Sequence, residues 1–238
     1  MAIFFLFVFL GGAPSSSDAQ LKEMFREFKG NFNTESKLST EKIIEALKEA
    51  LRTGTENAVA MVSKQDGYLK NEAIKILLPP SVKKTEAFLR AAGYGPQLEA
   101  FEESMNRAAE RAAPIARDVF WESLKDMSIS DAEGILKGDD YAATTYFKEK
   151  TFNPLFEQFK PVVNQSMHGV GVTKRYLELV EAVKKIPFAG SFSFNLDDYV
   201  TKGSLEGLFT MLAREEKKIR NDPSARVTDI LKEVFGKR

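Results

Sequence analysis

Apolar residues recur at every third or fourth position along most of the chain, which is the spacing of helices that bury one face. The clearest case is residues 96–113, because Pro96 suits the first position of a helix and an apolar stripe follows it. The stripe consists of Leu98, Phe101, Met105, Ala108, Ala112 and Ile115, widened by Ala109, Ala113 and Ala116. Neighbouring backbones can approach such a smooth helix closely, so we predict that it lies at the centre of a helical bundle.

The same spacing predicts helices over most of the remaining chain. Besides the central helix, which we expect to bend at Pro114 and continue to residue 124, they are 21–32, 39–63, 81–92, 130–137, 141–147, 152–167, 172–186, 196–220 and 227–235. The last but one carries a weak point at Gly203. Only residues 74–78 look extended. No segment alternates with a period of two and the links are short, so we expect one all-helical domain over residues 38–238 with about nine or ten helices.

The N-terminus begins with eight consecutive apolar residues, 3–10, followed by small ones. This arrangement resembles a secretory signal peptide, with Ser17-Asp18-Ala19 as a cleavage site and Gln20 as the mature start. The run is shorter than the roughly 20 residues of a transmembrane helix. We therefore expect export to the periplasm or the exterior after removal of residues 1–19, with 20–37 as an N-terminal helix and link. The alternatives are an N-terminal strand or helix that docks on the body, or a misassigned start codon.

Composition removes several classes of function. Lys plus Arg equals Asp plus Glu, 34 of each, whereas nucleic-acid binders normally carry a basic excess. The chain has no cysteine, which excludes thiol nucleophiles, disulfides and cysteine metal sites. The single histidine, His168, cannot form a His-based metal triad, and its surroundings do not resemble a nucleophile elbow. We therefore predict no catalytic nucleophile, no metal, no cofactor and no nucleic-acid partner.

The polar face of the central helix holds the candidate ligand-binding residues Glu102, Asn106, Arg107 and Glu110. One interpretation is a solvated face with ion pairs one helical turn apart. A second is a buried network that fixes the register of the bundle, in which each charge needs a partner. A third is the polar end of a ligand pocket, and a more remote one is acid–base catalysis by Glu102, Asn106 and Glu110.

A second candidate is a set of phenylalanines that does not follow helical spacing. Phe188, Phe192 and Phe194 crowd a loop that also contains glycine and serine. They either plug the core or form an exposed apolar patch for a lipid or a partner protein.

Three ordered blocks of residues resemble one known family, across roughly residues 38–236. The blocks comprise Asp66-Gly67-Tyr68-Leu69 with Phe101-Glu102 and 104–110; Met127, Asp131-Ala132, 134–136, Gly138, 142–144 and Tyr146-Phe147; and 196–201, 207–209, Glu216, Ile219-Arg220 and Pro223. They are similar to the family catalogued as domain of unknown function 4197. The resemblance implies an exported helical protein without an established activity, mostly bacterial. The chain departs from the family pattern at Leu77, where a proline is expected, and at its start, which lacks basic residues.

These observations lead to one functional hypothesis and two alternatives. The hypothesis is an exported, non-enzymatic binding or accessory protein that holds an apolar or amphipathic ligand between helices, near the small-residue flank. The first alternative is a protein–protein scaffold or envelope-associated interaction module. The second is a carboxylate-dependent hydrolase.

Overall fold

A computed structural model describes residues 40–169, 177–178, 181 and 195–222. The predicted signal peptide at 1–19, the predicted helices at 21–32 and 227–235, most of that at 172–186, and Phe188, Phe192 and Phe194 lie outside these residues. Glu41–Arg238 is one compact unit and Met1–Thr40 is another. Apart from Thr40, the described residues all belong to the first of these units.

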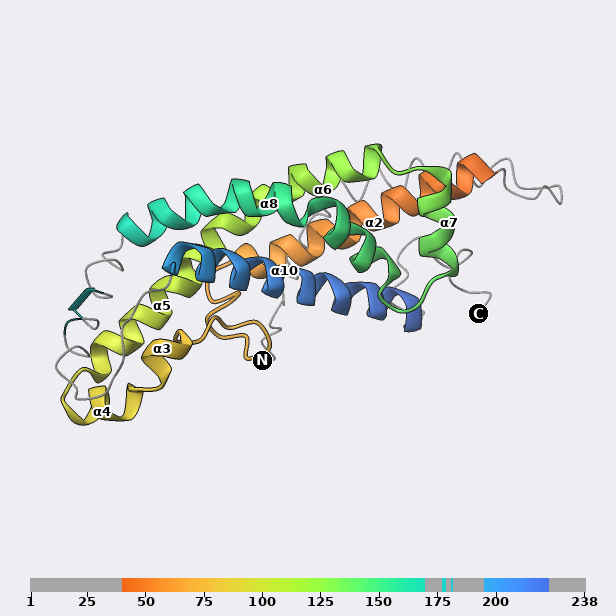
Figure 1. Ribbon diagram of the computed structural model, residues 1–238. Helices are drawn as coiled ribbons and strands as arrows, with labels where there is room; N and C mark the ends of the chain where they lie inside the picture. Colours follow the sequence, from red (N-terminus) through yellow and green to blue (C-terminus); the bar gives the residue numbers. More distant parts are fainter. Residues whose placement is uncertain (1–39, 170–176, 179–180, 182–194, 223–238) are drawn as a thin grey trace, which may run out of the picture. The chain divides into compact units, whose positions relative to one another are not determined.

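The described residues form helices joined by short links, and none of them forms a strand. The all-helical fold class is therefore confirmed for this part of the chain. The elements are α2 (Thr40–Ser63), α3 (Pro80–Lys83), α4 (Glu86–Ala91), α5 (Gly95–Ala112), the 3-10 turn η1 (Ala113–Ile115), α6 (Ala116–Lys125), α7 (Ile129–Lys137), α8 (Ala142–Gly169) and α10 (Leu196–Asn221) (Figure 1). No helix among them is both long enough and apolar enough to cross a bilayer.

The described residues contain fewer helices than the nine or ten expected for the whole chain, three of which were predicted largely outside these residues. Within the described ranges the chain has seven helices of six residues or more, and α3 is a single turn. One reason is that α8 joins two predicted helices, running unbroken through Pro154 and Pro161. A buried residue stands at every fourth position of α8, namely Ala143, Phe147, Thr151, Leu155, Phe159, Val163 and Met167. Both prolines lie on the exposed side, so the backbone hydrogen bonds that they remove face water and the buried stripe continues.

The alanine-lined helix, α5, packs against α8, α10 and α4. Its flank is filled by these neighbours, because Ala108, Ala109, Ala112, Ala113 and Ala116 are each at most 1% exposed. The bend expected at Pro114 is the 3-10 turn η1, which leads directly into α6. The small side chains therefore permit close helix packing, as predicted.

Contacts between aromatic rings join α6, α8 and α10. The ring centroid of Phe120 on α6 lies 5.1 Å from that of Phe147 on α8 and 6.0 Å from that of Phe209 on α10. Such tilted and edge-to-face contacts add about 0.5–1.5 kcal/mol per pair beyond burial. They join α6 to both α8 and α10.

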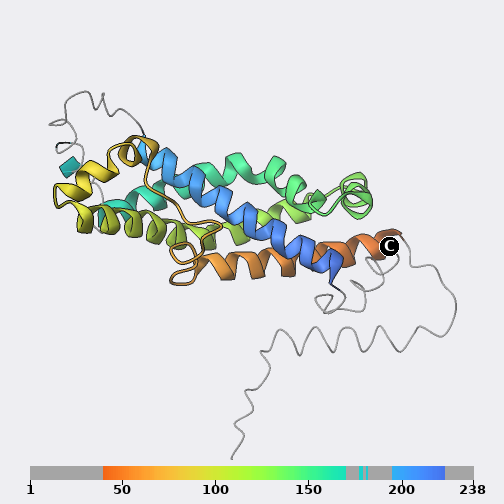
Figure 2. The ribbon, with the colours of Figure 1, turned by 90° about the horizontal axis from the view of Figure 1, so that it is seen from below.

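Residues 64–79, which we call the connector, run between α2 and α3 without forming a helix. The connector passes between α5 and α10 (Figures 1 and 2). Two glycines of α10 make room for it: a Cβ at Gly207 would lie 2.5 Å from the Tyr68 ring, and one at Gly203 would lie 3.3 Å from Ile76. Gly203 therefore marks a close contact, and α10 is continuous where a weak point was expected.

Candidate functional site

The four polar candidates on α5 lie in a row along the connector. Glu110 is buried, and its carboxylate accepts hydrogen bonds from the N–H groups of Tyr68 and Leu69, at 3.1 and 3.3 Å. Its other oxygen lies 2.8 Å from Nη1 of Arg107. The carboxylate thus satisfies two backbone donors of the connector while its charge is neutralised.

Arg107 links α5 to the turn at the start of the connector. Its Nη2 lies 2.7 Å from Asp66 Oδ1, and Lys70 binds the other oxygen of the same carboxylate at 2.7 Å. Hydrogen bonds from Lys70 and from Arg107 lower the pKa of Asp66, and the bond to Glu110 is the main cause that raises the pKa of Arg107. Asp66 adopts a left-handed conformation, with φ of 66°, which aspartate tolerates better than most residues.

Asn106 binds the second half of the connector. Its Oδ1 accepts the N–H of Ile76 at 2.8 Å, and its Nδ2 donates to the carbonyls of Ile76 at 2.9 Å and Glu102 at 2.8 Å. The side chain is fully buried. Beside it, the Glu102 carboxylate pairs with Lys75 at 2.5 Å. One side chain of α5 therefore takes up both backbone polar groups of Ile76, which would otherwise be buried without partners.

These contacts correspond to the buried-network interpretation of the α5 face. The structure brings Glu102, Asn106, Arg107 and Glu110 onto the connector, and it does not direct Glu102, Asn106 and Glu110 together into a cleft. A role for them in ligand binding stays a prediction, as does the patch of Phe188, Phe192 and Phe194.

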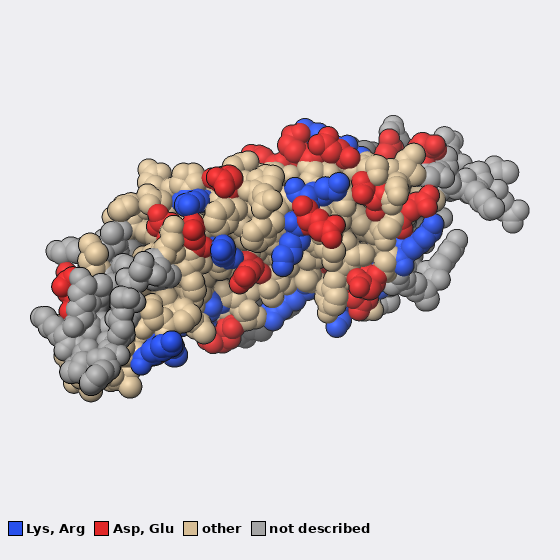
Figure 3. All heavy atoms as spheres, viewed as in Figure 1, with Lys and Arg blue, Asp and Glu red and all other residues tan. Residues whose placement is uncertain are grey.

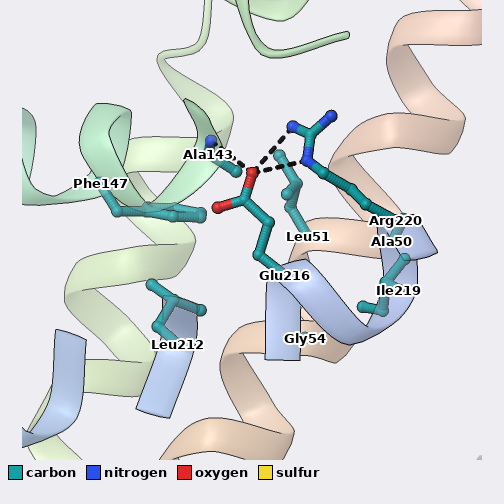
Figure 4. Close-up of a pocket in the computed structure, with 9 residues that line it drawn as sticks. All are labelled: Ala50, Leu51, Gly54, Ala143, Phe147, Leu212, Glu216, Ile219 and Arg220. Carbon is teal, nitrogen blue, oxygen red and sulfur yellow. Dashed lines mark hydrogen bonds and ion pairs between the residues drawn. The ribbon is translucent and has the colours of Figure 1, made fainter. Parts of the chain in front are cut away.

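A second buried charged pair, on α10, joins α7 to α8 (Figure 4). The side chains of Glu216 and Arg220 are 7% and 2% exposed, and their closest charged atoms lie 2.8 Å apart. Glu216 accepts the N–H groups of Ala143 and Thr144 and the Thr144 hydroxyl, each at 2.8 Å, while Arg220 donates to the Ile135 carbonyl at 2.8 Å. Glu216 thereby satisfies amides in the first turn of α8, and Arg220 satisfies a carbonyl in the last turn of α7.

Next to this pair is a small cavity, which Figure 4 shows. Its volume is about 30 Å³, and its apolar lining includes Leu51, Phe147, Leu212 and Ile219. This volume suits about one or two water molecules and is far below that of a pocket for an organic ligand.

The larger hollows lie at the surface. One, which we call the connector–α10 groove, has a volume of about 460 Å³. It is lined by residues 73–77 of the connector and, from α10, by Tyr199, Lys202, Gly203, Glu206, Gly207 and Thr210. A second groove of about 370 Å³ runs between α6 and α8, and its lining includes the carboxylates of Asp118, Glu122 and Asp126. In the part of the chain that the structure describes, no cluster of histidine and acidic side chains is arranged to hold a metal ion.

The model of the family described as "Protein of unknown function (DUF4197)" matches residues 37–236, most of the chain. The chain belongs to the DUF4197 family. The resemblance found in the three sequence blocks is therefore confirmed. No curated protein and no solved structure matches the chain. The description of the family names no activity, so the function of this DUF4197 member has to be argued from its geometry.

The surface charge of this DUF4197 protein is mixed. On the face shown in Figure 3, acidic and basic side chains alternate, with uncharged surface between them. An electrostatic footprint for nucleic acid would gather basic side chains in one stripe or patch. The face in view thus fits the balance of 34 basic and 34 acidic residues in the sequence.

Sequence analysis missed Glu216 and Arg220 as structural residues, although both belong to the third block of the DUF4197 resemblance. A signal was present. The apolar stripe of α10 passes through Leu205, Leu208 and Leu212, and Glu216 stands at its next position. A charge on an apolar stripe with an arginine four residues later indicates a buried pair.

The burial of Tyr68 predicts how the stability of the protein changes at alkaline pH. It is fully buried, its hydroxyl donates to the Ser204 carbonyl at 2.5 Å, and burial followed by the nearby Glu110 charge raises its pKa. Above about pH 10 the unfolded chain loses this proton while the folded chain keeps it, so stability falls as pH rises, by about 1.4 kcal/mol per pH unit. Urea unfolding from pH 9 to 11 should give a smaller decline for Tyr68→Phe than for the wild type. Equal declines would contradict the shift.

Proposed function

We propose that this DUF4197 member is a non-enzymatic binding protein whose apolar or amphipathic ligand lies in the connector–α10 groove. The observation that carries the proposal is the composition of the groove. The 55% exposed Leu77 supplies apolar surface beside the largely buried Ile74 and Ile76, while Lys202 and Glu206 supply opposite charges. Clefts of about 300–1,000 Å³ with an apolar lining and a few polar groups are typical of ligand sites.

The groove supports the proposal better than the small-residue flank of α5 does. The flank alanines are in contact with neighbouring helices, and the cavity beside Glu216 has only about 30 Å³. A ligand between the helices would therefore have to displace packed side chains, at a cost in stability. A ligand in the groove displaces only water.

The proposal is tested with a matched pair of charge substitutions. Leu77→Asp places a charge in the groove, whereas Phe88→Asp changes an equally exposed apolar residue of α4, 53% exposed, outside it. Titration with anilinonaphthalene sulfonate, an amphipathic dye, should show binding weakened about tenfold, or about 1.4 kcal/mol, by Leu77→Asp alone. Equal binding by both variants and the wild type would contradict the proposed site.

Native mass spectrometry of the protein from its own host extends this test. We expect a bound small molecule or peptide on the wild type and on Phe88→Asp, and its loss from Leu77→Asp. The same spectrum reports the N-terminal residue. A mature chain that begins at Gln20 would support export, and an intact Met1 start would contradict it.

A further inference from the structure

The backbone of the connector leaves a turn at residues 72–74 and is extended from residue 75 along the groove. Ile74 packs beside Gly207 and Ile76 beside Gly203, so two connector residues advance as far as four residues of α10. Four helical residues rise about 6 Å, which gives about 3 Å per connector residue, close to the 3.3 Å of a β-strand. Asn106 binds both the N–H and the carbonyl of Ile76, and these two groups point the same way only in extended backbone.

One edge of this extended backbone pairs with Asn106 of α5, so the opposite edge presents a second set of backbone polar groups. Because successive residues of a strand alternate, the Lys75 carbonyl and both backbone groups of Leu77 point away from α5, along the groove. The Leu77 carbonyl accepts the Tyr199 hydroxyl from that side, at 3.1 Å. The Lys75 N–H instead donates to the Asn71 carbonyl of the preceding turn, at 2.8 Å. The Leu77 N–H and the Lys75 carbonyl form no hydrogen bond with any residue that the structure describes. They are the pair of groups that an added strand would use.

The groove has the length of a short strand. Its α10 wall extends from Tyr199 to Thr210, which corresponds to about 16 Å at 1.5 Å per residue. About five extended residues span the same distance. An alkyl chain would fill this length but would leave the Leu77 N–H without a partner, whereas a peptide backbone supplies the carbonyl that it needs.

The charged side chains of the groove indicate which peptide sequences would bind there. Lys202 and Glu206 both line the groove, and neither forms an ion pair with another described residue. They are four helical positions apart, a rise of about 6 Å. Side chains two residues apart on one face of a strand are separated by about 6.6 Å. A strand that carries an acidic and a basic residue at positions i and i+2 therefore complements this wall.

We propose that the occupant of the connector–α10 groove is an extended polypeptide segment, which adds as a strand along residues 75–77 and directs an acidic-x-basic pair of side chains at Lys202 and Glu206. This inference rests on the proposed function and names the ligand class for the same groove. The backbone of the partner pairs with the Leu77 N–H, and its apolar side chains contact Leu77 and Tyr199. It is distinct from a lipid site, because strand addition needs backbone donors and acceptors in the ligand.

The experiment uses the full chain and a pool of octapeptides. Each peptide has a fixed Glu-x-Lys core and apolar residues at the flanking positions. Peptides selected on the immobilised protein are labelled and titrated by fluorescence anisotropy, together with N-methylated copies that keep the side chains but lose backbone donors and strand geometry. We expect the N-methylated copies to bind at least tenfold more weakly.

Four variants test the backbone and side-chain contributions to binding separately. Leu77→Pro removes the N–H that no described residue uses, while Leu77→Ala keeps it, so Leu77→Pro should weaken the binding of the unmethylated peptides much more than Leu77→Ala does. Lys202→Glu should weaken the Glu-x-Lys peptides, and peptides with a Lys-x-Lys core should recover binding to it, because Glu206 still needs a basic side chain. Lys218→Glu, outside the groove on the same helix, is the control and should bind like the wild type. Thermal unfolding verifies that each variant is folded.

The outcomes distinguish the two proposals. If no peptide of the pool binds while the dye still binds and remains sensitive to Leu77→Asp, the strand proposal fails and the binding groove stands. If neither peptide nor dye binds, both fail. If Leu77→Pro binds the selected peptides as tightly as the wild type does, strand addition at Leu77 is refuted. A peptide would then still be the ligand, but it would not pair with the Leu77 N–H.

Discussion

Glu216→Gln is expected to lower the free energy of unfolding by about 3–5 kcal/mol, the usual loss when one partner of a buried ion pair is removed. The substitution keeps the size of the side chain but removes the carboxylate charge that lies 2.8 Å from the buried Arg220. It also places an amide where a carboxylate accepts the N–H groups of Ala143 and Thr144. Urea unfolding at neutral pH, followed by circular dichroism, measures the effect.

The control is Glu206→Gln on the same helix. Glu206 is exposed and makes no ion pair with another described residue, so its change should stay within about 0.5 kcal/mol of the wild type. Similar losses for the two variants would mean that the carboxylate of Glu216 does not hold the ends of α7 and α8 together.

Asn106→Leu is expected to have an effect of similar size on the connector. Leucine has the same number and branching of side-chain heavy atoms as asparagine, but it leaves the N–H and the carbonyl of Ile76 buried without partners. At about 1–3 kcal/mol for each group, the loss is about 2–6 kcal/mol. Hydrogen exchange should place the largest loss of protection in the connector, and unchanged protection there would contradict the role of Asn106.

Asn106→Asp provides a sharper test of the same contacts through pH. A protonated aspartic acid can donate to the Ile76 carbonyl as asparagine does, whereas the buried carboxylate would repel it. The pKa of the introduced group should therefore be raised in the folded protein, so stability is present at low pH and lost as pH rises through that pKa. A variant as stable at pH 7 as at pH 4, relative to the wild type, would argue against this geometry.

The parts of the fold that could be predicted from sequence are those that a single helix determines. The stripe and alanine flank of α5 depend on spacing alone, and the polar face was recognised as a candidate network. The continuity of α8 could not be predicted, because it depends on which side of the helix Pro154 and Pro161 face. Gly203 looked like a weak point until Ile76 was found packed against it.

The candidate site could be predicted only in part, because sequence spacing identifies residues on one helix but not their partners elsewhere. Glu102, Asn106 and Glu110 were identified on α5, but their partners in the connector are 27 to 42 residues away and follow no periodic pattern. The groove needs two segments far apart in sequence, since Leu77 and Tyr199 are separated by 122 positions. The spacing of residues in the sequence predicts which side chains share one face of a helix. A groove forms between two segments, and spacing does not predict which segments lie together.

The bond between the Tyr68 hydroxyl and the Ser204 carbonyl spans 136 positions of sequence. At about 5–20 residues per second, a ribosome needs roughly 7–27 s to synthesise the intervening chain. After α5 has been synthesised, the connector has this helix beside it but still lacks α10, so its apolar residues stay accessible to chaperones. Completion of α10 therefore sets the earliest moment at which the nascent protein can bury Tyr68.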